Sequence, residues 1–346
     1  MLKNDALLKA IRREPVPHTP IWIMRQAGRY MPEYRAVRSK VDFLTLCKTP
    51  SLATEVTLQP IDLLGVDAAI IFSDILIPVE AMGMHLELGD AGPKLHDPLR
   101  TAADIERLAV FDPEDRTPFV TEAIRQTVKA LGGRVPLIGF CGAPFTLAAY
   151  MIEGGGSKNF LHAKRFLFEQ PEAAHRLFDK LTRTLTEYLR AQVRAGADVV
   201  QIFDSWGGEL SPRDFDEWTA PYVSRIIEGV KKEGAPVIFF ATGASALLER
   251  MKGLGADAIG LDWRIELDVA RRRLGPDVAV QGNLDPLCLF LPKEKLEERV
   301  KDILARAGDT GHIFNLGHGI LPPTDPAMAK YLVDTVHRLS ARGSRP

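Results

Sequence analysis

Residues 171–205 read PEAAHRLFDKLTRTLTEYLRAQVRAGADVVQIFDS, and this stretch contains a complete helix-to-strand unit. Leucines at 177, 181, 185 and 189 recur every four residues between Pro171 near the start and Gly196 just past the end, the pattern of a helix with one apolar face. Residues 198–203 then form a short and almost continuously apolar run, as expected for a parallel strand covered on both faces. The unit predicts a helix that packs on a parallel sheet.

Similar units extend over the rest of the chain. A helix is predicted between Thr49-Pro50 and Gly65, and another at 293–304. Because strand and helix patterns alternate and eight strands are counted, we predict an α/β fold and a single (β/α)8 TIM-type barrel over residues 1–346. A doubly wound open sheet is the alternative. The seven other apolar runs are 21–24, 68–72, 135–140, 236–241, 258–261, 278–281 and 312–316.

Two segments depart from the plain repeat. Residues 84–96 predict a β-hairpin inserted after the second strand, with its turn at 89–93. Residues 25–49 form a long excursion after the first strand. Neither a change in composition nor a linker marks a domain boundary.

The composition limits where the protein works and what it binds. The 44 Lys and Arg residues nearly balance the 45 Asp and Glu residues, so no global field would attract nucleic acid or an anionic membrane. No signal peptide or membrane span is recognisable, and the isolated Cys47, Cys141 and Cys288 suit reduced thiols. We therefore expect a soluble cytoplasmic protein in which an anionic ligand would meet locally placed cations.

Polar side chains follow five of the predicted strands. In an α/β barrel the loops after the carboxyl ends of the strands meet at one face, so an active-site cleft is expected there. All seven of these side chains are predicted to lie on that face. They are Arg25 and Arg29 after the first strand, Asp74 after the second, Tyr150 beyond the third, Asp204 and Ser205 after the fourth, and His318 after the eighth.

The charged members of this set each have a structural alternative. Arg25 and Arg29 are four residues apart, so on a helix both guanidiniums would project from one side as anion receptors. They could instead pair with surface acids. Gly28, between them, favours close approach of a ligand. Asp74 could cap the next helix or act in catalysis, whereas a cap is the more typical role for Asp204.

The three uncharged residues of this set also have alternative interpretations. Tyr150 could be a core tyrosine with a satisfied hydroxyl group. Ser205 lacks the surroundings of a nucleophile elbow, which favours a hydrogen-bonding role. His318, between two glycines, suits either a ligand contact or a structural role.

Five motifs, spread in order over nearly the whole chain, point to one family. They are MRQAGRYMPEYRAVR at 24–38, IIFSDIL from Ile70, GFCGAPFTLAAYMIEGGGSK from Gly139, GNLDP from Gly282 and NLGHGI from Asn315. Their combination is highly specific and resembles the uroporphyrinogen decarboxylase family.

This resemblance implies a set of site residues. Asp74 would lie beneath the pyrrole nitrogens of the substrate and, with Arg25 and Arg29, would be catalytic. Asp204 and Trp206 depart from the Glu and His of some relatives, which puts local detail in doubt. The implied substrate-binding residues are Arg25, Gln26, Ala27, Gly28 and Arg29, which would receive carboxylates, together with Asp74, Tyr150, Ser205 and His318.

The resemblance also implies a reaction, the conversion of uroporphyrinogen III to coproporphyrinogen III in haem synthesis, with four acetates becoming methyl groups. A protonated pyrrole ring can accept the electrons that departing carbon dioxide leaves behind, so no metal or organic cofactor is expected. A carboxylate such as Asp74 would stabilise the developing positive charge. The candidate proton donors are Arg25, Tyr150, His318 and water. The family further implies a homodimer.

Two other functions compete with this one. Zinc-dependent methyltransferases share the superfamily fold but need thiolate and imidazole ligands. The loop at 240–244, after the fifth predicted strand, contains neither Cys nor His. A non-enzymatic tetrapyrrole carrier would need the carboxylate receptors but not Asp74.

Overall fold

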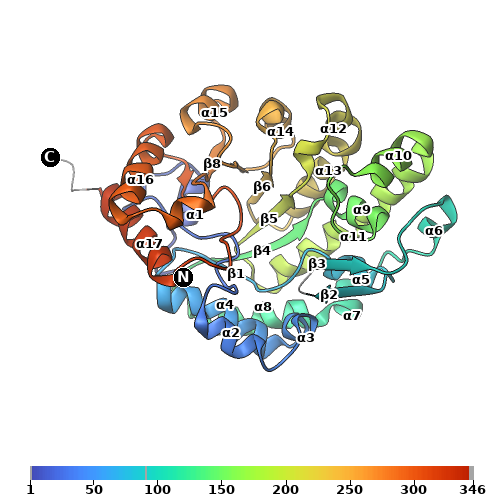
Figure 1. The fold of residues 1–346 in the computed structure, drawn as a ribbon, viewed down its shortest axis with the longest axis horizontal. Coiled ribbons are helices and arrows are strands. Elements are labelled where there is room, and N and C mark those ends of the chain that lie inside the picture. The colour runs from blue at the N-terminus through green and yellow to red at the C-terminus, as the bar shows by residue number, and fades with distance from the viewer. Residues whose placement is uncertain (1, 90–91, 343–346) are drawn as a thin grey trace.

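The computed structural model describes residues 2–89 and 92–342. At its centre is a parallel sheet of seven strands within the described residues, in the order β1-β4-β5-β6-β7-β8-β9. Figure 1 shows this curled sheet surrounded by helices. The predicted α/β class and parallel sheet are thus confirmed. The strands are β1 (Ala69–Ile70), β4 (Leu137–Gly142), β5 (Val199–Asp204), β6 (Val237–Ala241), β7 (Ala258–Gly260), β8 (Ala279–Gln281) and β9 (His312–Ile313).

The first predicted strand, at 21–24, contributes a single bridging residue. Ile21 forms an isolated parallel bridge with Phe314, just after β9. On its other side, the backbone N–H of Asp67, before β1, donates to the Ile21 carbonyl at 2.8 Å. The expectation of eight regular strands is therefore wrong for the described residues: seven strands form the sheet, and residue 21 lies between its two outer strands.

Side-chain acceptors explain why this segment is not a regular strand. The backbone N–H of Ile23 donates to Oε1 of Gln26 at 3.1 Å. The backbone N–H of Met24 donates to Oδ1 of Asn315 at 3.0 Å. Because these amides are bound by side chains, the backbone ladder does not continue beyond Trp22, whose N–H donates to the Phe314 carbonyl.

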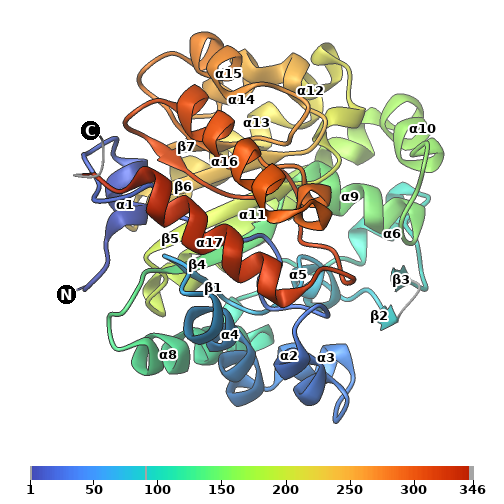
Figure 2. The ribbon, with the colours of Figure 1, turned by 60° about the vertical axis from the view of Figure 1, so that its left-hand side comes forward.

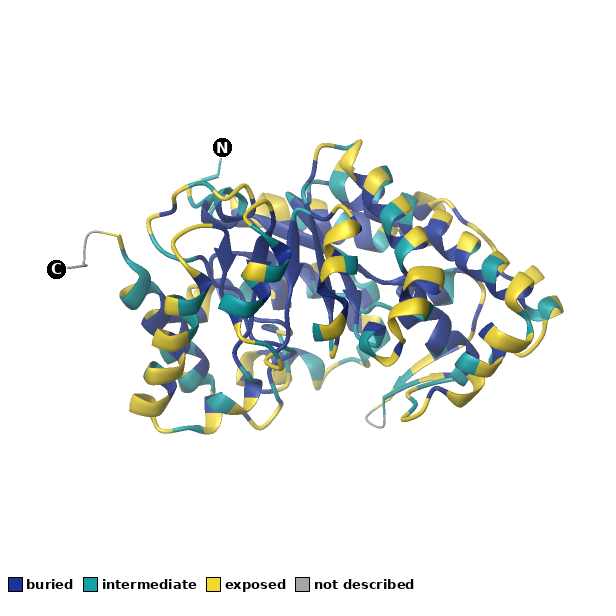
Figure 3. Cartoon of the chain, turned by 90° about the horizontal axis from the view of Figure 1, so that it is seen from above, coloured by how far each residue is buried: buried dark blue, intermediate teal, exposed yellow. Residues whose placement is uncertain are grey.

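The helices form an outer layer whose inner faces are buried (Figures 2 and 3). The long predicted helix is confirmed as α11, and Gly65 ends α4 in the left-handed conformation, with φ of 73°. No helix in the described part of the chain is long and apolar enough to cross a membrane. The helices are α1 (Ala6–Ile11), α2 (Pro32–Arg38), α3 (Phe43–Lys48), α4 (Pro50–Leu64), α5 (Ile77–Ala81), α6 (Ala102–Glu106), α7 (Pro113–Arg116), α8 (Pro118–Leu131), α9 (Pro144–Glu153), α10 (Leu161–Glu169), α11 (Pro171–Arg194), α12 (Pro212–Trp218), α13 (Ala220–Lys231), α14 (Leu248–Gly253), α15 (Leu267–Leu274), α16 (Lys293–Ala307) and α17 (Pro326–Ser340), with short 3-10 helices η1 (Gly207–Glu209), η2 (Ser245–Leu247) and η3 (Pro286–Phe290).

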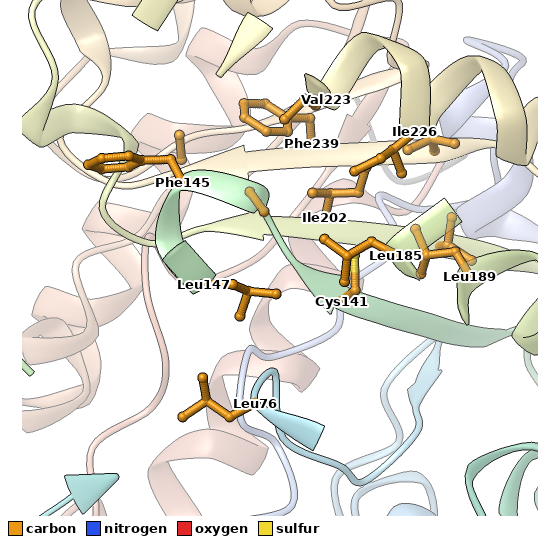
Figure 4. Packing of buried hydrophobic residues seen from close by; sticks show 14 of the residues in the cluster. Leu76, Cys141, Phe145, Leu147, Leu185, Leu189, Ile202, Val223, Ile226 and Phe239 are labelled. Carbon is orange, nitrogen blue, oxygen red and sulfur yellow. The ribbon is translucent and has the colours of Figure 1, made fainter. Parts of the chain in front are cut away.

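The core lies between this helical layer and the sheet. Leu185 and Leu189 of α11 belong to the same buried cluster as Cys141 of β4 and Ile202 of β5, and none of the four is exposed (Figure 4). Full burial of each leucine stabilises the fold by roughly 1.5–3 kcal/mol relative to an exposed one. The leucine repeat of α11 thus holds the helix against the strands whose ends carry the site.

The predicted hairpin is confirmed by strands β2 (Leu86–Gly89) and β3 (Gly92–Leu95), which pair antiparallel. Two residues of its predicted turn, Asp90 and Ala91, lie outside the described residues. A bridge between Lys94 and Gly155 joins the hairpin to the segment after α9.

Candidate active site

The loop after the first bridging residue carries both predicted arginines. Residues 25–31 form turns, and helix α2 begins only at Pro32. Arg25 has a left-handed backbone, with φ of 64°. The arrangement of Arg25 and Arg29 on one side of a helix is therefore wrong, because this backbone cannot continue a right-handed helix. Both arginine side chains are exposed.

Internal hydrogen bonds fix the shape of this loop. Gln26 is only 1% exposed, and its Nε2 donates to the carbonyl of Ala68 at 3.0 Å. The hydroxyl group of Tyr30 donates to the Gln26 carbonyl at 2.7 Å. Arg35 donates to the carbonyls of Arg29 and Tyr30 at 2.8 and 2.9 Å. Gln26 and Arg35 therefore hold the backbone that presents the exposed arginines.

Two glycines allow Arg25 to take its place. A Cβ atom at Gly319 would lie 2.8 Å from Cγ of Arg25, so the arginine stem occupies the space that a side chain would fill. A Cβ atom at Gly28 would lie 2.9 Å from the Arg25 carbonyl oxygen. The backbone N–H of Ile320 also donates to the carbonyl of Met24 at 2.9 Å. The first and last loops of the predicted face are thus in direct contact.

Asp74 lies in the turn after β1. Its Oδ1 accepts the backbone N–H of Leu76 at 2.9 Å, just before α5. Burial raises the pKa of this carboxyl group, although the Leu76 hydrogen bond and the positive charge of Arg25 oppose the rise. The side chain nevertheless keeps partial contact with solvent. Because α5 itself begins without a side-chain cap, the capping interpretation is wrong: Asp74 fixes the turn that precedes the helix and remains accessible to a ligand.

Tyr150, in α9, lies close enough to Asp74 and Arg25 for their charges to affect the pKa of its phenol. The pKa of its phenol is raised to about 12, mainly by burial, with the negative charge of Asp74 adding to the rise and the positive charge of Arg25 opposing it. Its ring centroid lies 4.0 Å from that of Trp206. Ser205, which is partly buried, precedes Trp206 in the turn after β5. Tyr150 and the segment that contains Ser205 therefore lie side by side.

His318 completes the group. The pKa of its imidazole is lowered to about 4, mainly by burial, with the positive charges of Arg25 and Arg264 adding to the fall and Asp262 opposing it. Its ring centroid lies 6.4 Å from that of Phe240 in β6. The imidazole is therefore neutral at pH 7 and can donate or accept a hydrogen bond.

These interactions bring four of the predicted residues together. Arg25 acts electrostatically on Asp74, Tyr150 and His318, which come from segments that follow three different strands. The charge of Arg29 acts instead on the phenol of Tyr34, in α2. The structure thus supports one group around Arg25, with Arg29 on a neighbouring part of the same loop.

Asp204 has surroundings that its sequence position did not predict. It is the last residue of β5 and fully buried, and it accepts the hydroxyl hydrogen of Thr146 at 2.6 Å. No hydrogen-bond partner of its Oδ2 is present among the described residues, and burial raises the pKa to about 7. Helix η1, which follows, has no side-chain cap. Asp204 therefore does not cap the helix that follows it; its carboxylate instead contacts Thr146 in the first turn of α9.

Only one group of side chains in residues 2–89 and 92–342 is suited to hold a metal ion, and it is not at this face. It consists of His18, Asp67 and His337. Asp67 precedes β1, whereas Asp74 follows that strand. The two sites therefore lie at opposite ends of the sheet.

Comparison with known proteins shows which family the chain belongs to. The profile of "Uroporphyrinogen decarboxylase (URO-D)" matches residues 2–339. The chain is 65% identical to the uroporphyrinogen decarboxylase of Myxococcus xanthus, over 97% of this chain and 96% of that protein. It is 55% identical to the one from Geobacter metallireducens, over 98% and 100%.

Solved structures support the fold alone. A methyltransferase from Methanosarcina mazei superposes with a TM-score of 0.81 at 22% identity, over 97% of this chain and 98% of that chain. At this level of identity the likeness carries no information about the reaction. The profile match and the two close relatives, by contrast, cover nearly the whole chain, and it therefore belongs to the uroporphyrinogen decarboxylase family.

Proposed function

We propose that this protein catalyses the decarboxylation of uroporphyrinogen III to coproporphyrinogen III, a step of haem synthesis. Membership of the family over nearly its whole length is the observation that carries the proposal. The grouping of Arg25 with Asp74, Tyr150 and His318 supports it, because these are the residues that such chemistry needs.

We propose that residues 1–346 form a single barrel domain with the substrate cleft at the carboxyl ends of its strands. The segment at residue 21 would be the eighth element that closes the sheet. Its bridge to Phe314 on one side and its hydrogen bond to Asp67 on the other support this closure. Active sites of such barrels are built at the carboxyl ends of the strands.

The substrate would be held through its carboxylate arms. The exposed guanidiniums of Arg25 and Arg29 can each bind a carboxylate through two parallel hydrogen bonds. Gly28 and Ala27 would allow the arms to approach the loop backbone, which Gln26 holds in place from below. Tyr150, Ser205 and His318 would line the cleft. Binding would therefore depend on local cations in a chain whose net charge is −1.

The reaction itself requires an electron sink and a counter-charge. Protonation makes one pyrrole ring cationic, the bond to the acetate carboxylate breaks, and its electron pair enters that ring as carbon dioxide leaves. The exocyclic carbon then takes up a proton and the ring loses one, so each acetate becomes a methyl group with net uptake of one proton. Asp74 would stabilise the cationic ring, and its low-dielectric surroundings strengthen that attraction. The pyrrole itself provides the sink, so the proposal includes no cofactor.

The protonation states of His318 and Tyr150, which lie near Asp74 and Arg25, limit the roles that these two residues can have in the reaction. His318 is neutral at pH 7, so it would act as a hydrogen-bonding group rather than as a charged acid. Tyr150, with a pKa of about 12, keeps its phenolic proton. Both can therefore orient a carboxylate arm without adding charge.

The direct test is to incubate the purified protein anaerobically with uroporphyrinogen III and to separate the products by carboxylate number. We expect stepwise loss of four carboxylates. Recovery of unchanged substrate that has nevertheless bound to the protein would favour the tetrapyrrole carrier instead and contradict the proposal.

We also propose that the protein works in the cytoplasm as a homodimer. Three free cysteines, two of them buried, suit a reducing compartment. Exposed apolar side chains such as Leu161 and Phe168 on α10 offer surface that a second copy could cover. Sedimentation equilibrium should give about twice the chain mass of 38.2 kDa, and the chain mass itself would contradict the dimer.

A further inference from the structure

A second cluster of reactive side chains lies at the opposite ends of the strands from the candidate active site. His18 precedes the bridging residue Ile21, Asp67 precedes β1, and His337 is in the last turn of α17. One nitrogen or oxygen atom of each of the three side chains lies within 4.8 Å of the corresponding atoms of the other two. Three segments that are far apart in sequence thus meet at one point.

The two imidazoles approach the carboxylate in the same way. Nε2 of His18 lies 2.9 Å from Oδ1 of Asp67, and Nε2 of His337 lies 2.7 Å from Oδ2. The ring centroids are 4.3 Å apart, with the planes tilted by 57°. Both rings therefore present the nitrogen that commonly binds metals toward a shared carboxylate.

The carboxylate is also held by groups that are not potential ligands. The side-chain amide of Asn4 donates to Oδ1 of Asp67 at 2.8 Å, and the backbone N–H of Ile21 donates to Oδ2 at 2.8 Å. If a metal ion replaced the hydrogen bonds from the two histidines, Oδ1 would keep its bond from Asn4 and Oδ2 would keep its bond from Ile21. Such outer hydrogen bonds orient ligands and strengthen metal binding.

Independent contacts hold the two histidines near each other. The backbone N–H of Thr19 donates to the hydroxyl oxygen of Ser340 at 2.9 Å, and the backbone N–H of Arg342 donates to the carbonyl of Pro17 at 2.8 Å. Figure 2 shows the end of α17 beside the N-terminal segment. The site is therefore already assembled before any ion binds.

We propose that His18, Asp67 and His337 bind one divalent first-row transition metal ion, represented by Zn2+. Two imidazoles and one carboxylate are suitable ligands for such an ion. The histidine side chains are 24% and 28% exposed, so water can reach the site and supply the remaining ligand.

The present geometry is close to that of a metal site. Tetrahedral bonds of about 2.0–2.1 Å correspond to ligand separations of about 3.4 Å, so Nε2 of His18 would withdraw from Oδ1 by roughly 0.5 Å and Nε2 of His337 from Oδ2 by roughly 0.7 Å. The bound ion would join the N-terminal segment, the entrance to β1 and the last helix. Its expected effect is on stability, at a distance from the decarboxylation site.

The test is calorimetric titration of the chelator-treated full-length protein with Zn2+. We expect one ion per chain. His18→Gln and His337→Gln each keep an amide N–H that can donate to Asp67 but lose the imidazole ligand. Since loss of an outer-shell partner already weakens metal binding by about 10–100-fold, loss of a ligand should weaken it by more than about 100-fold.

The hairpin supplies a matched control. His85 and His96 stack at 4.5 Å, and Nε2 of His96 lies 2.9 Å from Glu87, so this pair also combines imidazoles with a carboxylate. The double variant His85→Gln/His96→Gln should bind Zn2+ as the wild type does. Zn2+ should also raise the Tm of the wild type and of this control but not that of His18→Gln.

Three results would overturn the metal site. They are the absence of stoichiometric Zn2+ binding, binding that survives unchanged in both His18→Gln and His337→Gln, and binding that is lost only in the hairpin variant. Each of them can be obtained without measuring decarboxylation, so the proposed function stands or falls separately.

Discussion

Asp67 and Asp74 flank the same short strand, β1, yet their surroundings differ in almost every respect. Asp67 accepts four hydrogen bonds, from Asn4, His18, Ile21 and His337. Burial disfavours its charge, but the bonds from the two histidines outweigh that effect and hold its pKa below the ordinary value. Asp74 accepts one backbone hydrogen bond, and burial raises its pKa.

If the proposed function holds, one residue type serves stability at one end of this strand and chemistry at the other. A carboxylate whose oxygens are all paired contributes to folding, and a cation can bind to it only by displacing hydrogen-bond donors such as the two histidines. A carboxylate that is desolvated and has few partners is costly to keep charged but interacts strongly with a cation that arrives. Substitutions at four positions test this division of roles.

The largest expected effect is that of Asp74→Asn on turnover. Asn keeps the size and can still accept the Leu76 N–H, but it removes the charge that would stabilise the cationic pyrrole. We expect kcat to fall about 100–1000-fold, or roughly 3–4 kcal/mol, by analogy with the loss of one preorganised electrostatic contact. KM should change less or improve, because an anion near the carboxylate arms is gone. A folded variant with the wild-type kcat would make Asp74 a structural residue only.

Asp67→Asn should act on stability instead. Asp67 now accepts hydrogen bonds from four donors. In the variant, the NH2 group of the new amide would face at least one of these donors and could not accept its hydrogen. We expect the free energy of unfolding to fall by roughly 3 kcal/mol, as for a broken buried network. Urea denaturation with a chelator present measures the loss of hydrogen bonds alone. An unchanged denaturation midpoint would show that the network at the amino ends of the strands contributes little.

Asp204 provides a third carboxylate, at the same end of the sheet as Asp74. Since its folded pKa of about 7 is raised, its protonated form is favoured in the folded state. Its contribution is fully present below the unfolded pKa of about 4 and is lost as the pH rises to about 7. Asp204→Asn cannot ionise, so between pH 4 and pH 8 its stability relative to the wild type should improve by about 3–4 kcal/mol. Parallel stability–pH curves would show that Asp204 titrates normally.

The smallest effect is expected at the exposed Arg29. Arg29→Ala should raise KM about tenfold, because one bidentate carboxylate contact is lost. The KM of Arg29→Lys should lie between those of the wild type and Arg29→Ala. Steady-state kinetics at fixed ionic strength will separate them. Identical, wild-type kinetics for both variants would exclude a receptor role for Arg29.

Much of the fold could be predicted because its signals are local. The leucine repeat of α11 and the glycine that ends α4 lie within single segments, and both helices are confirmed. The strand predicted at 21–24 failed because Gln26 and Asn315 bind its amides, and the second of these residues lies 291 positions away from the amide it binds. No local pattern contains that information.

In the candidate site, too, features that follow from local sequence could be predicted, whereas contacts between distant segments could not. The rule that loops meet at the carboxyl ends of strands predicted a common face for Arg25, Asp74, Tyr150 and His318, and Arg25 acts electrostatically on the other three. The contact between Arg25 and Gly319 was not foreseen, although the glycines around His318 were noticeable. The cluster at His18, Asp67 and His337 was missed because its members share neither a motif nor a spacing.

The most direct test of this account is to measure kcat for Asp74→Asn and Asp67→Asn on uroporphyrinogen III in one assay, at a temperature well below the Tm of both variants. The account predicts a loss of about 100-fold or more for Asp74→Asn and wild-type turnover for the less stable Asp67→Asn. Wild-type turnover by a folded Asp74→Asn, or an equal loss in both variants, would contradict it.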